Sequence, residues 1–205
     1  MALANYSDLL TALSNWSKRT DLTSVYPDFV SLAEARMSKD LRIRSQVSTA
    51  TLTCVAGTQT VALPSDFLEA ENLTITSTTP QGSLSVVTPE YMDRKYPAGY
   101  STAQPAVYCT IGSNFLLGPT PDAAYTISLV YYTKVPSLQT NSTNWLMTNH
   151  PAIYLAACMA ELSAYTFDDE RISAWNERYQ AEITAIRKAD DDALRSGSAM
   201  RVRTV

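Results

Sequence analysis

Histidine and cysteine are scarce in this chain of 205 residues, which has one histidine and three cysteines. Cys54, Cys109 and Cys158 stand about fifty residues apart, without a C-x-x-C pair and without a neighbouring histidine. That spacing excludes a zinc site, and the odd count argues against a disulfide framework. We therefore expect three small buried hydrophobic residues, no bound metal and no other cofactor.

Charge is also scarce, and the basic residues are in the minority. Charged residues make up 18% of the chain, and 16 Lys and Arg against 20 Asp and Glu give a net charge of −4. A protein that binds duplex DNA needs a basic excess to neutralise phosphates, so sequence-specific DNA binding is disfavoured. No apolar run approaches the roughly 20 residues of a membrane span, and the first residues lack the basic and apolar regions that predict a signal peptide. We expect no membrane contact and a first location in a reducing cytoplasm.

Residues 1–48 are predicted to form two helices. The first has its apolar positions at helical spacing, with Asn5 or Ser7 as the cap. The second is predicted to open at Pro27, which suits a first helical turn. The apolar stripes of the two helices are formed by Tyr6, Leu9, Leu10, Leu13, Trp16, Phe29, Leu32, Ala33, Met37 and Leu41.

Residues 49–145 have a different composition. They contain nine charged residues, 26 Ser or Thr and eight of the ten prolines. Such content favours short antiparallel strands and turns, and thus a small sandwich or barrel. Gly112-Ser113-Asn114 is predicted to be a three-residue hairpin loop. The strands are expected near residues 50–54, 59–63, 73–77, 84–87, 107–111, 115–117 and 125–133.

Residues 146–194 return to helical patterns, and residues 195–205 are predicted to be an extended tail. The segment 152–165 is apolar on nearly all sides, so its own domain or a neighbouring subunit must cover it. Ile172, Trp175, Tyr179, Ile183 and Ile186 then form an amphipathic stripe. The expected fold class is α+β: four helices from the two ends form a frame, with the antiparallel β domain inserted between the second and third.

No catalytic motif stands out. His150 is the only histidine, so any nucleophilic triad must use it, yet no G-x-S-x-G or similar motif accompanies it. The carboxylates Asp66, Glu69 and Glu71 lie near a turn, and linear sequence does not bring two of them into one cleft. We expect no enzyme.

Four segments follow one another in a characteristic order. They are Tyr6-Ser7-Asp8-Leu9-Leu10 with Pro27 to Arg36, Leu63-Pro64-Ser65-Asp66-Phe67, Gly118-Pro119-Thr120-Pro121-Asp122, and Asn144-Trp145-Leu146 with His150-Pro151 and Asp168-Asp169-Glu170-Arg171. In this order they resemble the head-to-tail adaptor (connector) proteins of tailed bacteriophages, and the resemblance covers most of residues 6–190.

The resemblance implies a structural virion protein of the neck. Such adaptors form a homo-oligomeric ring, commonly a dodecamer, that docks on the portal protein after DNA packaging, extends the DNA channel and provides a platform for a downstream tail or nozzle protein. Their C-terminal segments grip the portal. The matching residues here would be Arg195, Met200, Arg201, Val202, Arg203 and Val205.

The acidic balance suits a channel through which double-stranded DNA passes without specific binding. In a ring, one lumenal Lys per subunit would add up to the roughly 6–10 phosphate contacts of a tight DNA binder. We therefore expect a neutral or acidic lumen, with Asp190, Asp191 and Asp192 as candidates to face it. The apolar segment 152–165 and the weakly charged β region are expected to supply subunit contacts.

Two alternatives remain open at this point. The Thr-rich β region also suits another tail component, such as a tail terminator or an adhesin-like module. An enzyme, for example a hydrolase that uses His150 and a carboxylate, is the third hypothesis.

Overall fold

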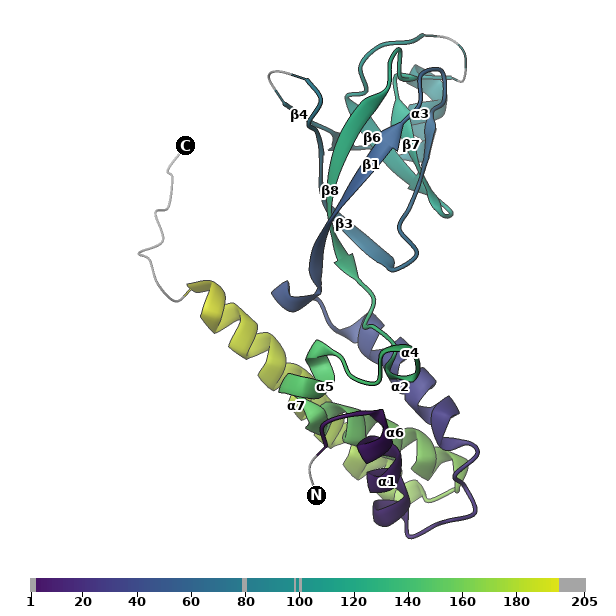
Figure 1. Ribbon diagram of the computed structural model, residues 1–205, viewed down its shortest axis with the longest axis vertical. Coiled ribbons are helices and arrows are strands. Elements are labelled where there is room, and N and C mark those ends of the chain that lie inside the picture. The colour runs from purple at the N-terminus through teal and green to yellow at the C-terminus, as the bar shows by residue number, and fades with distance from the viewer. Residues whose placement is uncertain (1–2, 79–80, 98, 100, 196–205) are drawn as a thin grey trace. The chain divides into compact units, whose positions relative to one another are not determined.

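The chain divides into a helical unit and a β unit in a computed structural model that describes residues 3–78, 81–97, 99 and 101–195 (Figure 1). The helical unit combines Met1–Gln46 with Val135–Val205, and the β unit is Val47–Lys134. The α+β fold class, with a β domain inserted into a helical frame, is thereby confirmed. The predicted tail lies outside the described residues, apart from Arg195.

The helical frame consists of four main helices and two short ones. The main helices are α1 (Tyr6–Ser17), α2 (Tyr26–Asp40), α6 (Pro151–Tyr165) and α7 (Asp169–Arg195). The short helices α4 (Leu138–Asn141) and α5 (Trp145–Asn149), which were not predicted, precede α6, and a single 3₁₀ turn, Arg44–Gln46, ends the first half of the unit. Because α7 continues to Arg195, this residue belongs to a helix and not to an extended tail.

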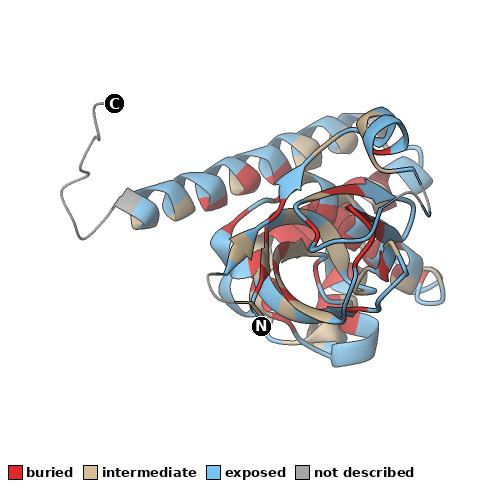
Figure 2. Cartoon of the chain, turned by 90° about the horizontal axis from the view of Figure 1, so that it is seen from above, coloured by how far each residue is buried: buried red, intermediate tan, exposed pale blue. Residues whose placement is uncertain are grey.

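Helix α6 is the centre of this unit, and α1, α2 and α7 all pack against it. All residues from Ile153 to Ala160 are buried, over more than two helical turns. Figure 2 shows the chain coloured by how far each described residue is buried. A helix can bury consecutive residues only when it is covered on every side. Its own unit therefore covers the stretch from Ile153 to Ala160, and this part of α6 is not available for contacts between subunits, contrary to the sequence-based expectation.

Local chemistry explains where the helices start. The Asn5 side chain accepts a hydrogen bond from the backbone N–H of Asp8 and caps α1, and Asn144 caps α5 through the N–H of Met147. A side-chain oxygen at this position satisfies a helix donor that has no partner within the helix. Helix α2 begins at Tyr26, one residue before Pro27, so proline occupies its first turn as predicted.

The described residues of the β unit form two four-stranded sheets and one helix. In the first sheet the strand order is β1-β8-β3-β4, and in the second it is β2-β7-β6-β5. All pairs are antiparallel except β5 with β6. The elements are β1 (Val47–Cys54), β2 (Thr60–Ala62), β3 (Phe67–Ile75), β4 (Gly82–Ser83), β5 (Ser85–Val86), α3 (Pro89–Lys95), β6 (Val107–Ile111), β7 (Asn114–Gly118) and β8 (Tyr125–Thr133).

One core joins the two sheets of the β unit. Leu73 and Leu129 from the first sheet and Phe115 and Leu117 from the second belong to the same buried cluster. The alternation of buried and half-buried residues along β8 matches the predicted strand with one buried face. Each predicted strand segment overlaps an observed strand, while β4 and α3 were not predicted.

The β6–β7 hairpin is tighter than predicted. Ile111 pairs with Asn114, so the loop has two residues, Gly112 and Ser113, and not three. Gly112 has a φ of 58°. Two-residue hairpin loops require positive φ values that match the strand twist, and glycine adopts them without a steric penalty.

The boundaries between the units also differ from the predicted ones. The β unit ends at Lys134, whereas the sequence analysis extended the β region to residue 145. Val135 and Leu138 are buried in the core of the helical unit. Two hydrogen bonds fix this crossing: the N–H of Val135 donates to Ser38 Oγ at 3.1 Å, and the N–H of Leu138 donates to Glu34 Oε1 at 2.7 Å.

Candidate interaction surfaces

Helix α7 is anchored in the helical unit by its middle turns. Tyr179, Ile183 and Ile186 are buried, as the predicted stripe requires. The Tyr179 hydroxyl donates to Asp40 Oδ2 at 2.7 Å, and the Arg36 guanidinium lies 4.1 Å from the centre of the Tyr179 ring. Burial, and then the hydrogen bond to Asp40, raise the pKa of Tyr179. Arg187 adds a hydrogen bond to the Asp40 carbonyl oxygen.

The last turns of α7 are more exposed. The helix has 27 residues and is therefore about 40 Å long. Ile186 is its last buried residue, Asp191 and Asp192 are exposed, and Leu194 is 61% exposed. The end of α7 therefore presents side chains to the surroundings and leads directly into the residues that were predicted to form the tail.

The three aspartates at this end differ in their surroundings. Asp190 Oδ1 accepts a hydrogen bond from Arg44 Nε at 2.8 Å, and its Oδ2 accepts one from the Arg44 backbone N–H at 3.2 Å. Asp190 therefore closes a contact within the helical unit. Asp191 and Asp192 line a shallow hollow of about 380 Å³ together with Arg187, Lys188 and Thr184.

His150 lies beside the Arg44–Asp190 pair in a hollow of about 170 Å³ that Ser45 also lines. A serine, a histidine and a carboxylate are thus neighbours, as the enzyme hypothesis would require. However, Arg44 holds the carboxylate, and within the described part of the chain no hydrogen bond joins the imidazole to Ser45 or Asp190. A nucleophilic triad needs both of these hydrogen bonds, so the catalytic arrangement is not assembled.

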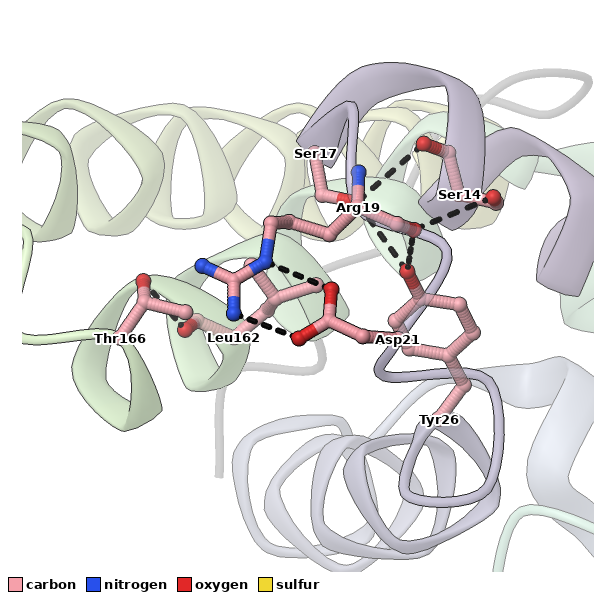
Figure 3. A network of polar contacts seen from close by, with 7 residues as sticks. All are labelled: Ser14, Ser17, Arg19, Asp21, Tyr26, Leu162 and Thr166. Carbon is pink, nitrogen blue, oxygen red and sulfur yellow. Dashed lines mark hydrogen bonds and ion pairs between the residues drawn. The ribbon is translucent and has the colours of Figure 1, made fainter.

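The loop between α1 and α2 is held by a polar network (Figure 3). The Arg19 side chain donates two hydrogen bonds to Asp21, at 2.8 and 2.7 Å, and the Tyr26 hydroxyl donates to the Arg19 carbonyl oxygen at 2.7 Å. The hydrogen bond from Arg19 lowers the pKa of Asp21 to about 2. Arg19 also lines a hollow of about 250 Å³ with Thr166 and Arg171 from the α6–α7 turn.

Two tryptophans and an arginine meet where α1 and α7 approach each other. The Trp16 and Trp175 rings are 5.5 Å apart in an edge-on arrangement, and the Arg178 guanidinium lies 5.4 Å from the Trp175 ring and 6.0 Å from the Trp16 ring. Trp16 is 50% exposed. Both tryptophans lie on predicted apolar stripes, but the linear sequence does not show that they meet, and Arg178 was not predicted to join them.

In the β unit, the segment Leu63-Pro64-Ser65-Asp66-Phe67 that contributed to the adaptor resemblance forms a turn. The N–H of Phe67 donates to the Pro64 carbonyl oxygen at 3.0 Å, and the N–H of Lys134 donates to the Asp66 carbonyl oxygen at 2.9 Å. The Tyr131 hydroxyl also donates to Asp66 Oδ1 at 3.1 Å. Asp66 therefore joins this turn to β8 and has a structural role.

The cysteines behave as the sequence predicted. Cys54, Cys109 and Cys158 are all free and buried. Burial raises the pKa of the thiols of Cys109 and Cys158, which keeps them protonated and unreactive. The described residues contain no group of three or more potential metal ligands.

Of the predicted portal-binding residues, Met200, Arg201, Val202, Arg203 and Val205 lie outside the described residues. Arg195 is the last residue of α7. No helix within the described ranges is long and apolar enough to span a membrane.

The exposed Trp–Arg cluster is a candidate interaction surface, because tryptophan and arginine are enriched among the side chains that dominate protein interfaces. Comparison with protein-family models gives the particular family: the model of the SU10 adaptor protein family matches residues 4–203. The chain therefore belongs to the SU10 adaptor protein family, and its role is that of a structural adaptor of a bacteriophage. No curated protein matches the chain.

Proposed function

We propose that the chain forms a ring, with twelve copies as the expected number, that docks on the portal protein in the neck of the virion. The ring would extend the DNA channel after packaging and provide the platform for a tail or nozzle protein. Family membership supports an adaptor role over nearly the whole chain. The proposal explains why the molecule combines a helical frame with a weakly charged β unit.

The observation that supports portal binding best is the end of α7. The helix extends past Ile186, its last buried residue, and leads directly into Ser196 and Gly197. The following Met200-Arg201-Val202-Arg203-Thr204-Val205 combines apolar side chains with arginines. Arginine and apolar anchors are favoured where a peptide binds a protein partner, and Gly and Ser before them give the segment reach.

Deletion of residues 196–205 tests this proposal. The described core of the helical unit ends at Ile186, so the shortened protein should keep its helical content and its melting temperature. It should lose portal binding, measured as co-sedimentation with purified portal rings. As a matched control, Arg201 and Arg203 are both replaced by Lys, which keeps the charge but removes the planar fork of donors and should weaken binding only in part. Normal portal binding by the shortened protein would contradict the tail assignment.

The acidic end of α7 is also proposed to face the DNA channel, now through Asp191 and Asp192. Asp190 would contribute less negative charge to this surface than the other two aspartates, because its carboxylate is paired with Arg44. Carboxylates at a lumen would prevent tight phosphate contacts, so DNA could slide past. An electron cryomicroscopy map of the assembled neck tests the placement, and a bore lined by Lys and Arg would contradict it.

A further inference from the structure

Trp16, Trp175 and Arg178 form an exposed cluster, here called the Trp–Arg face. The two indole rings provide a wide apolar platform, and Trp16 leaves half of its surface uncovered. Tryptophan and arginine are the residue types most enriched among the side chains that dominate protein interfaces. Trp175 packs against the core of the helical unit, whereas Trp16 does not belong to that cluster and covers Trp175 from the outside.

Arg178 has unused binding capacity. Its guanidinium lies over the two indole rings, and among the described residues it has neither an ion pair nor a hydrogen bond to a carboxylate. The N–H groups of a guanidinium point outward in its own plane, so an arginine that stacks on an aromatic ring can still donate two hydrogen bonds to a carboxylate. The Trp–Arg face therefore suits a partner that offers a carboxylate beside an apolar side chain.

The outer surface of α2 offers this combination. Asp28, Leu32 and Ala35 are exposed and lie on one side of the helix at three- and four-residue steps. Leu32 is 53% exposed. No ion pair or side-chain hydrogen bond of Asp28 exists among the residues that the structure describes. We call these three residues the Asp–Leu face.

We propose that the Trp–Arg face of one copy docks on the Asp–Leu face of the next copy, with Arg178 paired to Asp28 and Leu32 packed against the indole rings. The inference rests on the proposed ring. The partner is a second copy of this chain, because the chain carries both halves of the contact, one with the positive Arg178 and the other with the negative Asp28. A two-fold contact of either face with itself would bring Arg178 against Arg178, or Asp28 against Asp28.

The placement of the two faces decides the type of assembly. The Trp–Arg face belongs to α1 and α7, and the Asp–Leu face belongs to α2. A contact between two different faces is heterologous when each copy uses its two faces toward two different neighbours, and it then closes into a ring if the rotation between copies permits. If both pairs instead formed across one two-fold axis, the assembly would stop at a dimer, and the ring proposed here requires the heterologous arrangement.

A charge exchange on the full-length chain tests the pairing. Arg178→Asp or Asp28→Arg alone should lower the incorporation of the protein into necks about tenfold or more, because each places like charges at the contact. The double variant carries the reversed ion pair at every contact and should recover most of the incorporation. Arg94→Asp, an exposed arginine on α3 of the β unit, is the matched control and should have no effect.

Disulfide trapping in assembled particles gives a second measurement that does not depend on stability. The variant with Asp28→Cys and Arg178→Cys should produce a ladder of cross-linked chains under mild oxidation, because the contact is heterologous. Either single cysteine should give no ladder, and the natural cysteines are buried. Rings that assemble without a ladder, and that tolerate Arg178→Asp, would overturn this contact but leave the ring intact. Necks without any ring of this protein would overturn the proposed function itself.

Discussion

At the residue scale, buried polar groups decide where the chain crosses between its units. Glu34 is 7% exposed and accepts the N–H of Leu138, a residue 104 positions away. Burial raises the pKa of Glu34, and the hydrogen bonds from Leu138 and Ser137 oppose this shift. Ser38 makes the corresponding contact with Val135 one turn along α2. These two residues hold the start of the second helical segment against the first.

The raised pKa of Glu34 makes stability depend on pH. Because the folded-state pKa lies above the unfolded one, the stability linked to the protonated form is complete below the unfolded pKa and falls as the pH rises through the folded pKa. Glu34→Gln removes this dependence while it keeps the acceptor for Leu138. We expect the difference in free energy of unfolding between the variant and the natural chain to favour the variant more at pH 8 than at pH 4. Urea unfolding of both proteins at pH 4 and at pH 8 measures this difference. The same difference at the two pH values would contradict the prediction.

At the element scale, α6 organises the helical unit through small side chains. Ala156, Ala157 and Ala160 are buried on the helix that α1, α2 and α7 all contact. Small residues let the neighbouring helices approach closely, and large aromatic side chains such as Tyr154 fill the remaining space. The hydrogen bond from Asn144 to the Tyr154 hydroxyl, at 2.6 Å, satisfies the one polar atom that this aromatic ring brings into the core.

The close packing around α6 predicts a strong response to added volume. Ala157 is fully buried, so Ala157→Leu should destabilise the protein by about 1–3 kcal/mol, because neighbouring helices must move apart. Ala164 is exposed on the same helix, and Ala164→Leu should change stability by less than about 0.5 kcal/mol. Chemical denaturation of both variants checks the contrast. Equal effects would mean that α6 is not closely covered.

At the scale of the whole molecule, the β unit is an insertion with its own core. Val47 pairs with Tyr132, so the chain enters and leaves the unit on neighbouring strands. Among its described residues, eleven buried apolar side chains form a cluster separate from that of the helical unit. Adjacent ends and a private core are what an inserted domain needs to fold by itself.

We therefore expect residues 47–134 to fold when expressed alone. The isolated unit should show a cooperative thermal transition and dispersed amide signals in nuclear magnetic resonance spectra. The reciprocal protein, with residues 47–134 replaced by a short Gly-Ser link, should keep the helical content of the frame, because Val135 and Leu138 still meet Ser38 and Glu34. A molten spectrum from the isolated β unit would contradict its independence.

The sequence by itself determined the helix periods, the strand alternation and the change in composition that separates frame from insertion, because these depend on neighbours within a few residues. It also predicted that the cysteines are buried, since no spacing offers them a partner. The sequence pattern did not predict the short helices α3, α4 and α5, because segments of four to seven residues depend on capping and packing more than on a repeating pattern.

Only the tertiary structure decided which part of the molecule each predicted helix face contacts. Asp190, Asp191 and Asp192 are alike in sequence, yet Asp190 alone is bound by Arg44, which lies 146 residues earlier. Trp16 and Trp175 each fit a helical stripe, but their encounter and the position of Arg178 over them arise from α1 and α7 packing on the same helix. Local periodicity determines which side chains share a face, whereas the partner of that face depends on contacts between residues far apart in the chain.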